Sequence, residues 1–560
     1  MQIIHRRDFL RLSGATLAVG TASWLTGCAR LGQVQPEPTV SGNLTPDFSP
    51  DVELALRATS GEVALLDGAP TRVQTFQGEV LNGNAAVLQA LPYSYLGPII
   101  RVRRGQNIRV HFTNEIDSET IVHWHGLHVP AAMDGHPRDV IAPGETYVYE
   151  FQVNNRAGTY WFHPHPHRRT GPQVYAGLAG LFLVSDDEEA ALDLPADEAD
   201  IPLVIQDRTF DSNNQFVYIP NGIMDQTMGM LGERILVNGQ PDYVLPVATR
   251  AYRLRLLNGS NSRIYKLAWD DGTPLTVIAS DGGLLAQPVQ RDFVMLAPGE
   301  RVELWADFRE RAVGTEFQLR SLPFEGIDMD SGMMSGMMDS DSGHSGMMGG
   351  DSGHSGMMGG DSGHSGMPHG TQALPNGAEL SILTVRVEQN VQDSATLPPQ
   401  LAPLGFLAPA DARNQNAPRT FTVSMGHMEW LLNGRTFEME AVAQDENVQL
   451  GATEMWEFIN QEDAQGRLDM MGMAHPIHIH GAPCQIIERT PPSNATLKTN
   501  WEAIRAGYID EGWKDTFLMM PGERVKILLH FADYEGLYLY HCHTLEHEDG
   551  GMMRNYRVQA

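Results

Sequence analysis

A short turn signal recurs three times along the chain, as APGET at 142–146, APGER at 297–301 and MPGER at 520–524. Each copy directly precedes a run rich in β-branched and aromatic residues, namely YVYEFQV, VELWADF and VKILLHF. Proline and glycine end one element, and the residues that follow favour a strand. The copies stand too far apart for a stacked repeat, so we expect one copy in each of three β-sandwich domains.

The three domains should span residues 51–190, 200–392 and 415–560. A chain of 560 residues is too long for a single core, which agrees with this division. Two polar, proline-containing stretches, DDEEAALDLPADEAD and SATLPPQLAPL, lie at the junctions and are the predicted linkers.

Residues 328–370 depart from the strand pattern, because methionine, glycine, serine, aspartate and histidine make up nearly all of the segment. The decapeptide DSGHSGMMGG occurs twice in full and a third time in part. A segment almost without β-branched or aromatic residues cannot bury a core. We therefore expect a low-complexity insertion in the second domain, between strand-like runs at 316–324 and 378–387.

The N-terminus is typical of an export signal rather than of a folded domain. HRRDFLR at 5–11 places two adjacent arginines before a weakly apolar run, which predicts a twin-arginine signal over 1–28. The run is too short to span a membrane. LTGC resembles a lipoprotein cleavage box, so Cys28 is the expected lipid-anchor site; the alternative is ordinary cleavage nearby, which discards Cys28. A tether over 29–50 would follow, and the mature protein would work in the periplasm or cell envelope.

Charge bears on the partners of the chain. Lysine and arginine number 39 and aspartate and glutamate 69, so the net charge is −30. This balance argues against nucleic acid as a partner and favours the attraction of small cations, although solubility alone would also explain it.

The three cysteines divide into separate roles. Cys28 belongs to the signal, and Cys484, in the apolar run HGAPCQIIE, is expected to be a small buried residue. Cys542 lies between two histidines in HCH. No disulfide framework remains, although an extracytoplasmic compartment would permit one.

The histidines gather in four motifs, HWHG, WFHPHPH, HPIHIHG and HCHTLEHEDGGM. Alternate residues of a strand point to one face, so each His-x-His pair can present two imidazoles to one side. One pair is weak evidence, but four pairs from the first and third domains predict a shared metal pocket. The eight imidazoles belong to His123, His125, His163, His165, His478, His480, His541 and His543.

Within HCH, the two histidines should point to one side of the strand and Cys542 to the other. Cys542 can therefore bind a different metal ion, together with His475, His547 and Met552. Two imidazoles, a thiolate and an axial sulfur make up the blue-copper ligand set, which transfers one electron at a time. The alternative for Met552 is a core methionine beside Met553.

The four motifs, in this order, resemble those of the multicopper oxidases, and among them the three-domain bacterial periplasmic cuprous oxidases and laccases. The resemblance covers nearly the whole mature chain. It implies an all-β fold of three cupredoxin-like Greek-key β-sandwich domains, with the methionine-rich insertion in the second. It also implies four copper ions, three of them in a cluster between the first and third domains.

The resemblance divides the ligands into copper types. His475, Cys542, His547 and Met552 correspond to the type 1 copper, and His123 and His478 to the type 2 copper. The paired type 3 coppers correspond to His125, His163, His165, His480, His541 and His543. The implied reaction couples four one-electron oxidations of a substrate to the reduction of dioxygen to two waters.

Water formation requires protons, and carboxylates near the cluster are the natural carriers. Asp134, shortly after HWHG, and Glu548, directly after His547, match the positions of such carboxylates in the family. The alternatives are a turn aspartate before Gly135 and a solvated glutamate.

Thioethers prefer Cu(I), which makes the methionine-rich insertion a candidate for capture of cuprous substrate. The alternatives are a flexible spacer for the insertion and a core position for methionines outside it. The related oxidases carry their methionine-rich insertion in the third domain, and in some an aspartate stands where this chain has Met471. The candidate Cu(I) ligands are Met333, Met334, Met337, Met338, Met347, Met348, Met357, Met358, Met425, Met428, Met471 and Met473.

Three functions fit the sequence. The first is a cuprous oxidase that protects the cell envelope from copper. The second is a broader laccase that oxidises small phenols, or iron or manganese, with the insertion as a lid. The third is a copper store, against which a complete dioxygen site argues. We expect the protein to act as a monomer.

Overall fold

The computed structural model describes residues 40–41, 45, 47–91, 94–326, 373–426, 429–461 and 472–560. The expected signal over 1–28 with Cys28, most of the expected tether and the insertion over 328–370 lie outside the described residues. The described chain is almost entirely β-structure, as expected, and its strands form six sheets. Its helices are short, and none is long and apolar enough to cross a membrane.

The first domain consists of two five-stranded sheets that enclose one apolar core. Strand neighbours in the sheets are often not neighbours in the chain, so the connections cross over, as in Greek-key sandwiches. One sheet has the order β1 (Val40–Ser41), β8 (Thr146–Gln152), β6 (Asn107–Asn114), β2 (Val52–Val63) and β3 (Thr71–Asn82). The other has the order β4 (Leu88–Gln89), β5 (Ile99–Arg103), β10 (Gly180–Ser185), β9 (Gly158–Pro164) and β7 (Val122–His125).

The second domain has a seven-stranded and a five-stranded sheet around its own core. The larger sheet has the order β13 (Gln240–Pro241), β12 (Arg234–Val237), β11 (Asp200–Arg208), β15 (Ala251–Asn258), β20 (Arg301–Asp307), β17 (Leu275–Ser280) and β18 (Gly283–Arg291). The smaller has the order β14 (Val244–Ala248), β22 (Leu380–Gln389), β21 (Glu316–Ser321), β16 (Tyr265–Trp269) and β19 (Val294–Leu296). Antiparallel β21 and β22 flank the methionine-rich insertion in sequence, as predicted.

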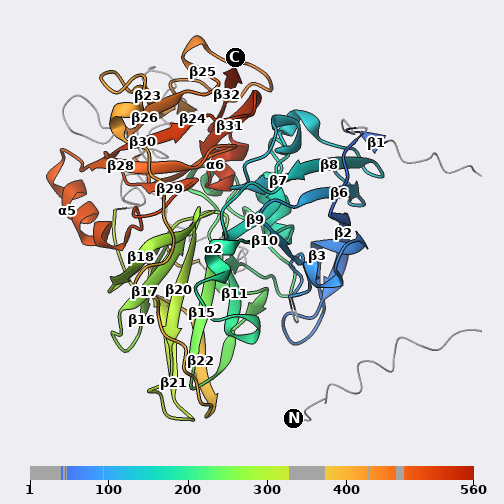
Figure 1. The fold of residues 1–560 in the computed structure, drawn as a ribbon, viewed down its shortest axis with the longest axis vertical. Coiled ribbons are helices and arrows are strands. Elements are labelled where there is room, and N and C mark those ends of the chain that lie inside the picture. Colours follow the sequence, from blue (N-terminus) through green and yellow to red (C-terminus); the bar gives the residue numbers. More distant parts are fainter. Residues whose placement is uncertain are drawn as a thin grey trace, which may run out of the picture. The chain divides into compact units, whose positions relative to one another are not determined.

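The third domain repeats the arrangement of two five-stranded sheets. One has the order β24 (Glu429–Leu432), β23 (Arg419–Gly426), β26 (Thr453–Asn460), β30 (Arg524–His530) and β28 (Cys484–Thr490). The other has the order β25 (Asn447–Gln449), β32 (Met553–Gln559), β31 (Gly536–Cys542), β27 (His475–Ile479) and β29 (Thr516–Met519). Figure 1 follows the three sandwiches from blue β2 and β3, through green and yellow β15 and β17, to red β31.

The recurring turn precedes a strand in each domain, as the sequence predicts, because β8, β20 and β30 begin within or directly after its three copies. The turn glycines Gly144, Gly299 and Gly522 have φ angles of 87°, 83° and 77°, a conformation that favours glycine. Each pair of sheets draws its strands from one expected domain range, apart from β1, which lies in the expected tether and pairs with β8. The domain boundaries themselves remain predictions.

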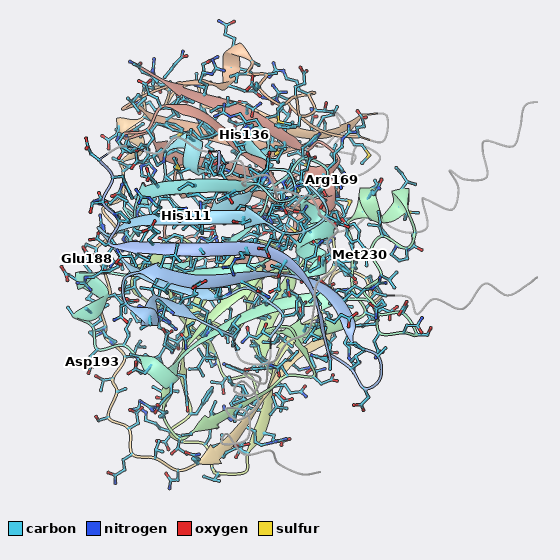
Figure 2. All side chains as sticks on the ribbon, turned by 90° about the vertical axis from the view of Figure 1, so that its right-hand side faces the viewer. His111, His136, Arg169, Glu188, Asp193 and Met230 are labelled. Carbon is cyan, nitrogen blue, oxygen red and sulfur yellow. The ribbon has the colours of Figure 1, made fainter. Side chains whose placement is uncertain are left out.

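The first and third domains contact each other directly. His136, labelled in Figure 2, donates from Nε2 to Asn555 Oδ1 of the third domain at 2.8 Å. Tyr538 of β31 donates its hydroxyl to the carbonyl oxygen of Val129 at 2.9 Å. These bonds hold the ends of β7 and β9 against those of β27 and β31, where the histidine motifs lie.

Candidate metal centre

Two antiparallel strand pairs carry most of the histidines. His123 of β7 is the register partner of His163 on β9, and His478 of β27 is that of His541 on β31. Alternation along each strand then places the second histidine of each motif on the same side. All eight imidazoles predicted to share a pocket are at most 1% exposed, and they do lie together.

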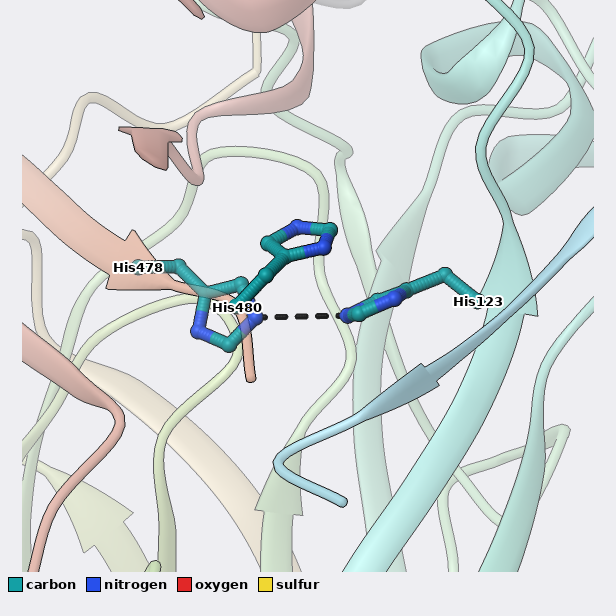
Figure 3. Close-up of side chains that lie close together, drawn as sticks. All are labelled: His123, His478 and His480. Carbon is teal, nitrogen blue, oxygen red and sulfur yellow. Dashed lines mark hydrogen bonds between the residues drawn. The ribbon is translucent and has the colours of Figure 1, made fainter. Parts of the chain in front are cut away.

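The first convergence of histidines joins the two domains. His123 Nε2 and His478 Nε2 lie 3.3 Å apart (Figure 3). The opposite nitrogen of each ring contacts a main-chain carbonyl, at 2.7 Å from Asp134 O and 2.9 Å from Asp515 O. A carbonyl oxygen can only accept a hydrogen bond, so the Nδ1 atom of each ring carries the proton. The Nε2 atom of each ring then has a free lone pair. Two lone pairs that face each other suit a cation held between them.

A second convergence repeats this pattern. His541 Nε2 lies 3.0 Å from His480 Nε2 and 3.3 Å from His165 Nε2. His541 donates from Nδ1 to Cys542 O at 3.0 Å, and His480 donates from Nδ1 to Asp134 Oδ2 at 2.7 Å. The Nε2 atoms of His480 and His541 are therefore free to bind a metal.

The third convergence lies beside the first. His125 Nδ1 is 3.4 Å from His163 Nε2, and His163 donates from Nδ1 to Pro164 O at 2.9 Å. The ring of His543 lies 4.9 Å from that of His125, and neither of its nitrogens has a hydrogen-bond partner in the described chain. A fully buried ring whose nitrogens lack hydrogen-bond partners fits the role of a metal ligand. His167, by contrast, packs against Phe437 away from these rings.

A separate group surrounds Cys542. Its Sγ lies 3.5 Å from His475 Nδ1 and 3.6 Å from His547 Nδ1. Met552 is fully buried in the same cluster, and its carbonyl oxygen accepts from the Cys542 amide at 3.1 Å. His547 donates from Nε2 to the carbonyl of Thr227 at 2.8 Å, which leaves its Nδ1 for a metal beside the sulfur.

The protonation of these groups suits a metal. Burial lowers the pKa of His163 to about 3 and those of His541 and His547 to about 4, so the rings stay neutral near neutral pH. Burial also raises the pKa of Cys542 to about 12, so its thiolate forms only when a cation offsets the buried charge. A thiolate with imidazoles is a donor set that copper favours.

The two carboxylates expected to carry protons lie against the histidines. Asp134 is fully buried and accepts from His480, as described above. Glu548 is 1% exposed; its oxygens lie 3.5 Å from His165 Nε2 and 3.2 Å from His541 Nδ1. Burial raises the pKa of both carboxyls well above their usual range. The alternative of a solvated glutamate is wrong, while Asp134 does also precede Gly135 in a turn with φ of 81°.

The candidate Cu(I) ligands divide by position. Met473 is 3% exposed and belongs to the core cluster of Cys542 and Met552, which favours the core alternative for it. Met425 is half-buried against the same cluster. The remaining candidates, Met428, Met471 and those of the insertion, lie outside the described residues. Cys484 is a buried free thiol, as expected.

The second domain covers the Cys542 group, which the sequence did not reveal. Helix α3 (Ile223–Met228) contacts α6 (Leu545–Asp549) and supplies the Thr227 carbonyl. Trp430 donates from Nε1 to that carbonyl at 3.1 Å, and its ring lies 4.6 Å from the ring of His475. A cavity of about 470 Å³ adjoins these groups, and Tyr218 also lines it. The sequence could not reveal this contact, because a main-chain oxygen makes it and any residue type has one. The only hint is that the stretch around Thr227, GIMDQTMGM, is rich in methionine.

Comparisons with known proteins agree with this geometry. A protein-family model described as multicopper oxidase matches residues 72–189, and a second with the same description matches residues 411–560. A laccase of Bacillus stratosphericus is 30% identical over 91% of this chain and 96% of its own. A bilirubin oxidase of Albifimbria verrucaria is 30% identical over 82% of this chain and 70% of its own. The solved structure of the multicopper oxidase McoA of Aquifex aeolicus is 31% identical, with a TM-score of 0.70, over 93% of this chain and 98% of its own.

Proposed function

The chain belongs to the multicopper oxidase family, and on that premise we propose that it oxidises Cu(I) and reduces dioxygen to water. As a member of the family it is a copper oxidoreductase. The proposed mononuclear site consists of His475, Cys542, His547 and Met552. The proposed three-copper site consists of the eight converging imidazoles, with His123 and His478 holding one ion and the other six a pair.

Bound copper would supply one-electron transfer at the mononuclear site and the electrons for dioxygen at the three-copper site. The chain joins the two sites through Cys542, which stands between His541 and His543 in sequence. The bond from His541 Nδ1 to Cys542 O, at 3.0 Å, adds a shorter route to the covalent one. Cys542 thus serves both as a ligand and as the start of the path for electrons.

Glu548 and Asp134 are the proposed proton carriers. Both oxygens of Glu548 lack a hydrogen-bond partner in the described chain, yet both face histidines. A buried carboxyl with a raised pKa can hold a proton near neutral pH and release it to a developing base. Asp134 lies 3.6 Å from His123 Nδ1 and can serve the same purpose there.

One observation carries the choice of Cu(I) as substrate. The repeats of DSGHSGMMGG place many thioethers in a segment that cannot form a core, and thioethers prefer Cu(I). Two features support this choice. The net charge of −30 attracts cations, and Met224 and Met228 belong to α3, whose Thr227 carbonyl contacts His547. A role in copper tolerance at the cell envelope follows, with export by the N-terminal signal and a lipid anchor at Cys28 as parts of the same proposal.

Oxidation of small phenols is the second candidate. The cavity that Thr227 lines has aromatic walls, Trp430 and Tyr218, and two relatives are named laccase and bilirubin oxidase. In this case the insertion would act as a lid rather than as a Cu(I) trap.

Oxygen uptake by the copper-loaded protein separates the two candidates. The substrates are a chelated Cu(I) and a phenol. A variant with every methionine of 328–370 changed to serine keeps the length of the insertion and removes its thioethers. We expect Cu(I) oxidation to fall and phenol oxidation to persist. Equal loss or equal retention of both activities would contradict capture of Cu(I) by the insertion.

A further inference from the structure

His125 has two different neighbours at its two ring nitrogens. Its Nδ1 faces His163, whereas its Nε2 lies 3.1 Å from Asp515 Oδ1 and 3.0 Å from Thr516 Oγ1. The same Asp515 accepts from His478 through its main-chain oxygen at 2.9 Å. One residue of the third domain therefore contacts histidines of both domains at the proposed three-copper site.

Asp515 is itself held by Arg301 of the second domain. The guanidinium makes two parallel bonds, with Nη1 at 2.7 Å from Oδ1 and Nη2 at 2.5 Å from Oδ2. Both side chains are buried, at 0% and 5% exposure. Arg301 also donates to the carbonyl oxygens of Thr159, Gly299 and Asp281, each at 3.0 Å. A carboxylate clamped in this way has a fixed orientation and two occupied oxygens.

Arg301 occupies the last position of the recurring turn and reaches the histidines through Asp515. The matching Arg524 of the third domain keeps 47% of its side chain exposed and pairs with Glu457 at 2.9 Å. The turn glycines differ in the same way. A methyl group on Gly299 would meet His543 Cδ2 at 3.0 Å and His125 Cε1 at 3.1 Å, whereas one on Gly144 would meet nothing within 4 Å.

We propose that Arg301 and Asp515 are positioning residues that fix the ring and the tautomer of His125. Asp515 accepts the Nε2 proton of His125, so the Nδ1 lone pair points toward His163. The second domain, which supplies none of the eight imidazoles, thereby sets the geometry of the proposed three-copper site. The inference rests on the proposed copper sites. It adds that Arg301 and Asp515 orient one of their ligands, His125.

The test compares copper binding in matched variants. Arg301→Gln and Asp515→Asn should each weaken copper at the three-copper site about tenfold or more, with a weaker type 3 near-ultraviolet band and an altered type 2 electron paramagnetic resonance signal. The visible type 1 band of Cys542 should persist and shows that the fold survives. Arg301→Lys keeps the positive charge but loses the two parallel hydrogen bonds to Asp515. It should restore only part of the type 2 and type 3 copper signals.

Two control variants carry the same chemical change elsewhere. Arg524→Gln should leave every copper signal unchanged. Gly299→Ala should perturb the type 3 band, whereas Gly144→Ala, at a similar φ, should not. If Arg301→Gln fails to fold, Asp515→Asn and Arg301→Lys decide the matter.

Normal type 2 and type 3 signals in Arg301→Gln and Asp515→Asn would overturn the inference. A lost copper in Asp515→Asn with normal binding in Arg301→Gln would also overturn it, because Asp515 would then be a ligand. Absence of type 2 and type 3 copper from the unmodified protein would instead refute the proposed function.

Discussion

His547 donates its Nε2 proton to the main-chain carbonyl of Thr227, 2.8 Å away, so a helix of the second domain closes the edge of this proposed copper ligand. A reductant in the adjoining cavity is therefore separated from the His547 imidazole by α3. Trp430 donates to the same carbonyl and completes the cover. Access to the proposed mononuclear site is thus set by residues outside its ligand set.

Trp430→Ala should admit phenols more readily. The indole packs against both His475 and His547, at ring distances of 4.6 and 4.9 Å, so its removal exposes them. We expect a lower KM for a phenol, and a loss of about 3–5 kcal/mol in the free energy of unfolding from the cavity left behind. Trp430→Phe keeps a ring and removes the N–H donor, so it is the control. Its KM for the phenol should lie between those of the unmodified protein and Trp430→Ala. An unchanged phenol KM in both variants would show that the cover does not limit access.

Cys542→Ser should abolish the visible blue absorption and leave copper bound at the histidines. Sulfur is essential to that absorption, whereas the eight imidazoles do not depend on it. Visible absorption and copper content per chain measure the two effects. Cys484→Ser is the matched control, because Cys484 is an equally buried thiol that is not among the proposed ligands, and it should keep the colour. Colour retained in Cys542→Ser would refute the assignment.

Glu548→Gln should keep the blue colour and slow dioxygen reduction about a hundredfold, since the amide cannot deliver a proton. Stopped-flow reoxidation of the reduced protein measures this step apart from substrate oxidation. Glu429→Gln, at an exposed position near Trp430, should reoxidise normally. Reoxidation at the unmodified rate in Glu548→Gln would exclude the proton role.

In the copper-free protein, the buried histidines should contribute a loss of stability as the pH falls below about 6.5. Burial lowers the pKa of His541 and His547 to about 4, so in the window between these values the unfolded chain binds more protons. The stabilisation is complete above the unfolded pKa and should shrink by about 2 kcal/mol for each such histidine at pH 5. Urea unfolding at about pH 7.5 and about pH 5 measures the difference. The buried carboxyls Asp134 and Glu548, whose pKa values are raised, oppose this trend, so the histidine contribution is read from the difference between the unmodified protein and His547→Gln. An equal pH dependence in the two proteins would contradict a buried neutral imidazole at position 547.

Much of this arrangement could be predicted from local sequence. Turn glycines with alternating strands after them indicate sandwiches, and histidines two apart on a strand share a face, as His123 and His125 do. Other features depend on contacts between domains. The bond from His547 to the Thr227 carbonyl and the Arg301–Asp515 pair form only when the second and third domains pack together. Methionine occurs both in apolar cores and as a metal ligand, so the sequence could not show that Met473 lies in the core.

Anomalous diffraction at the copper absorption edge tests the central claim most directly, because it locates copper atom by atom in crystals of the loaded protein. We expect density beside Cys542, between His123 and His478, between His125 and His163, and among His165, His480 and His541. Copper beside Cys542 with empty gaps between the histidines, or no copper in either place, would contradict the account.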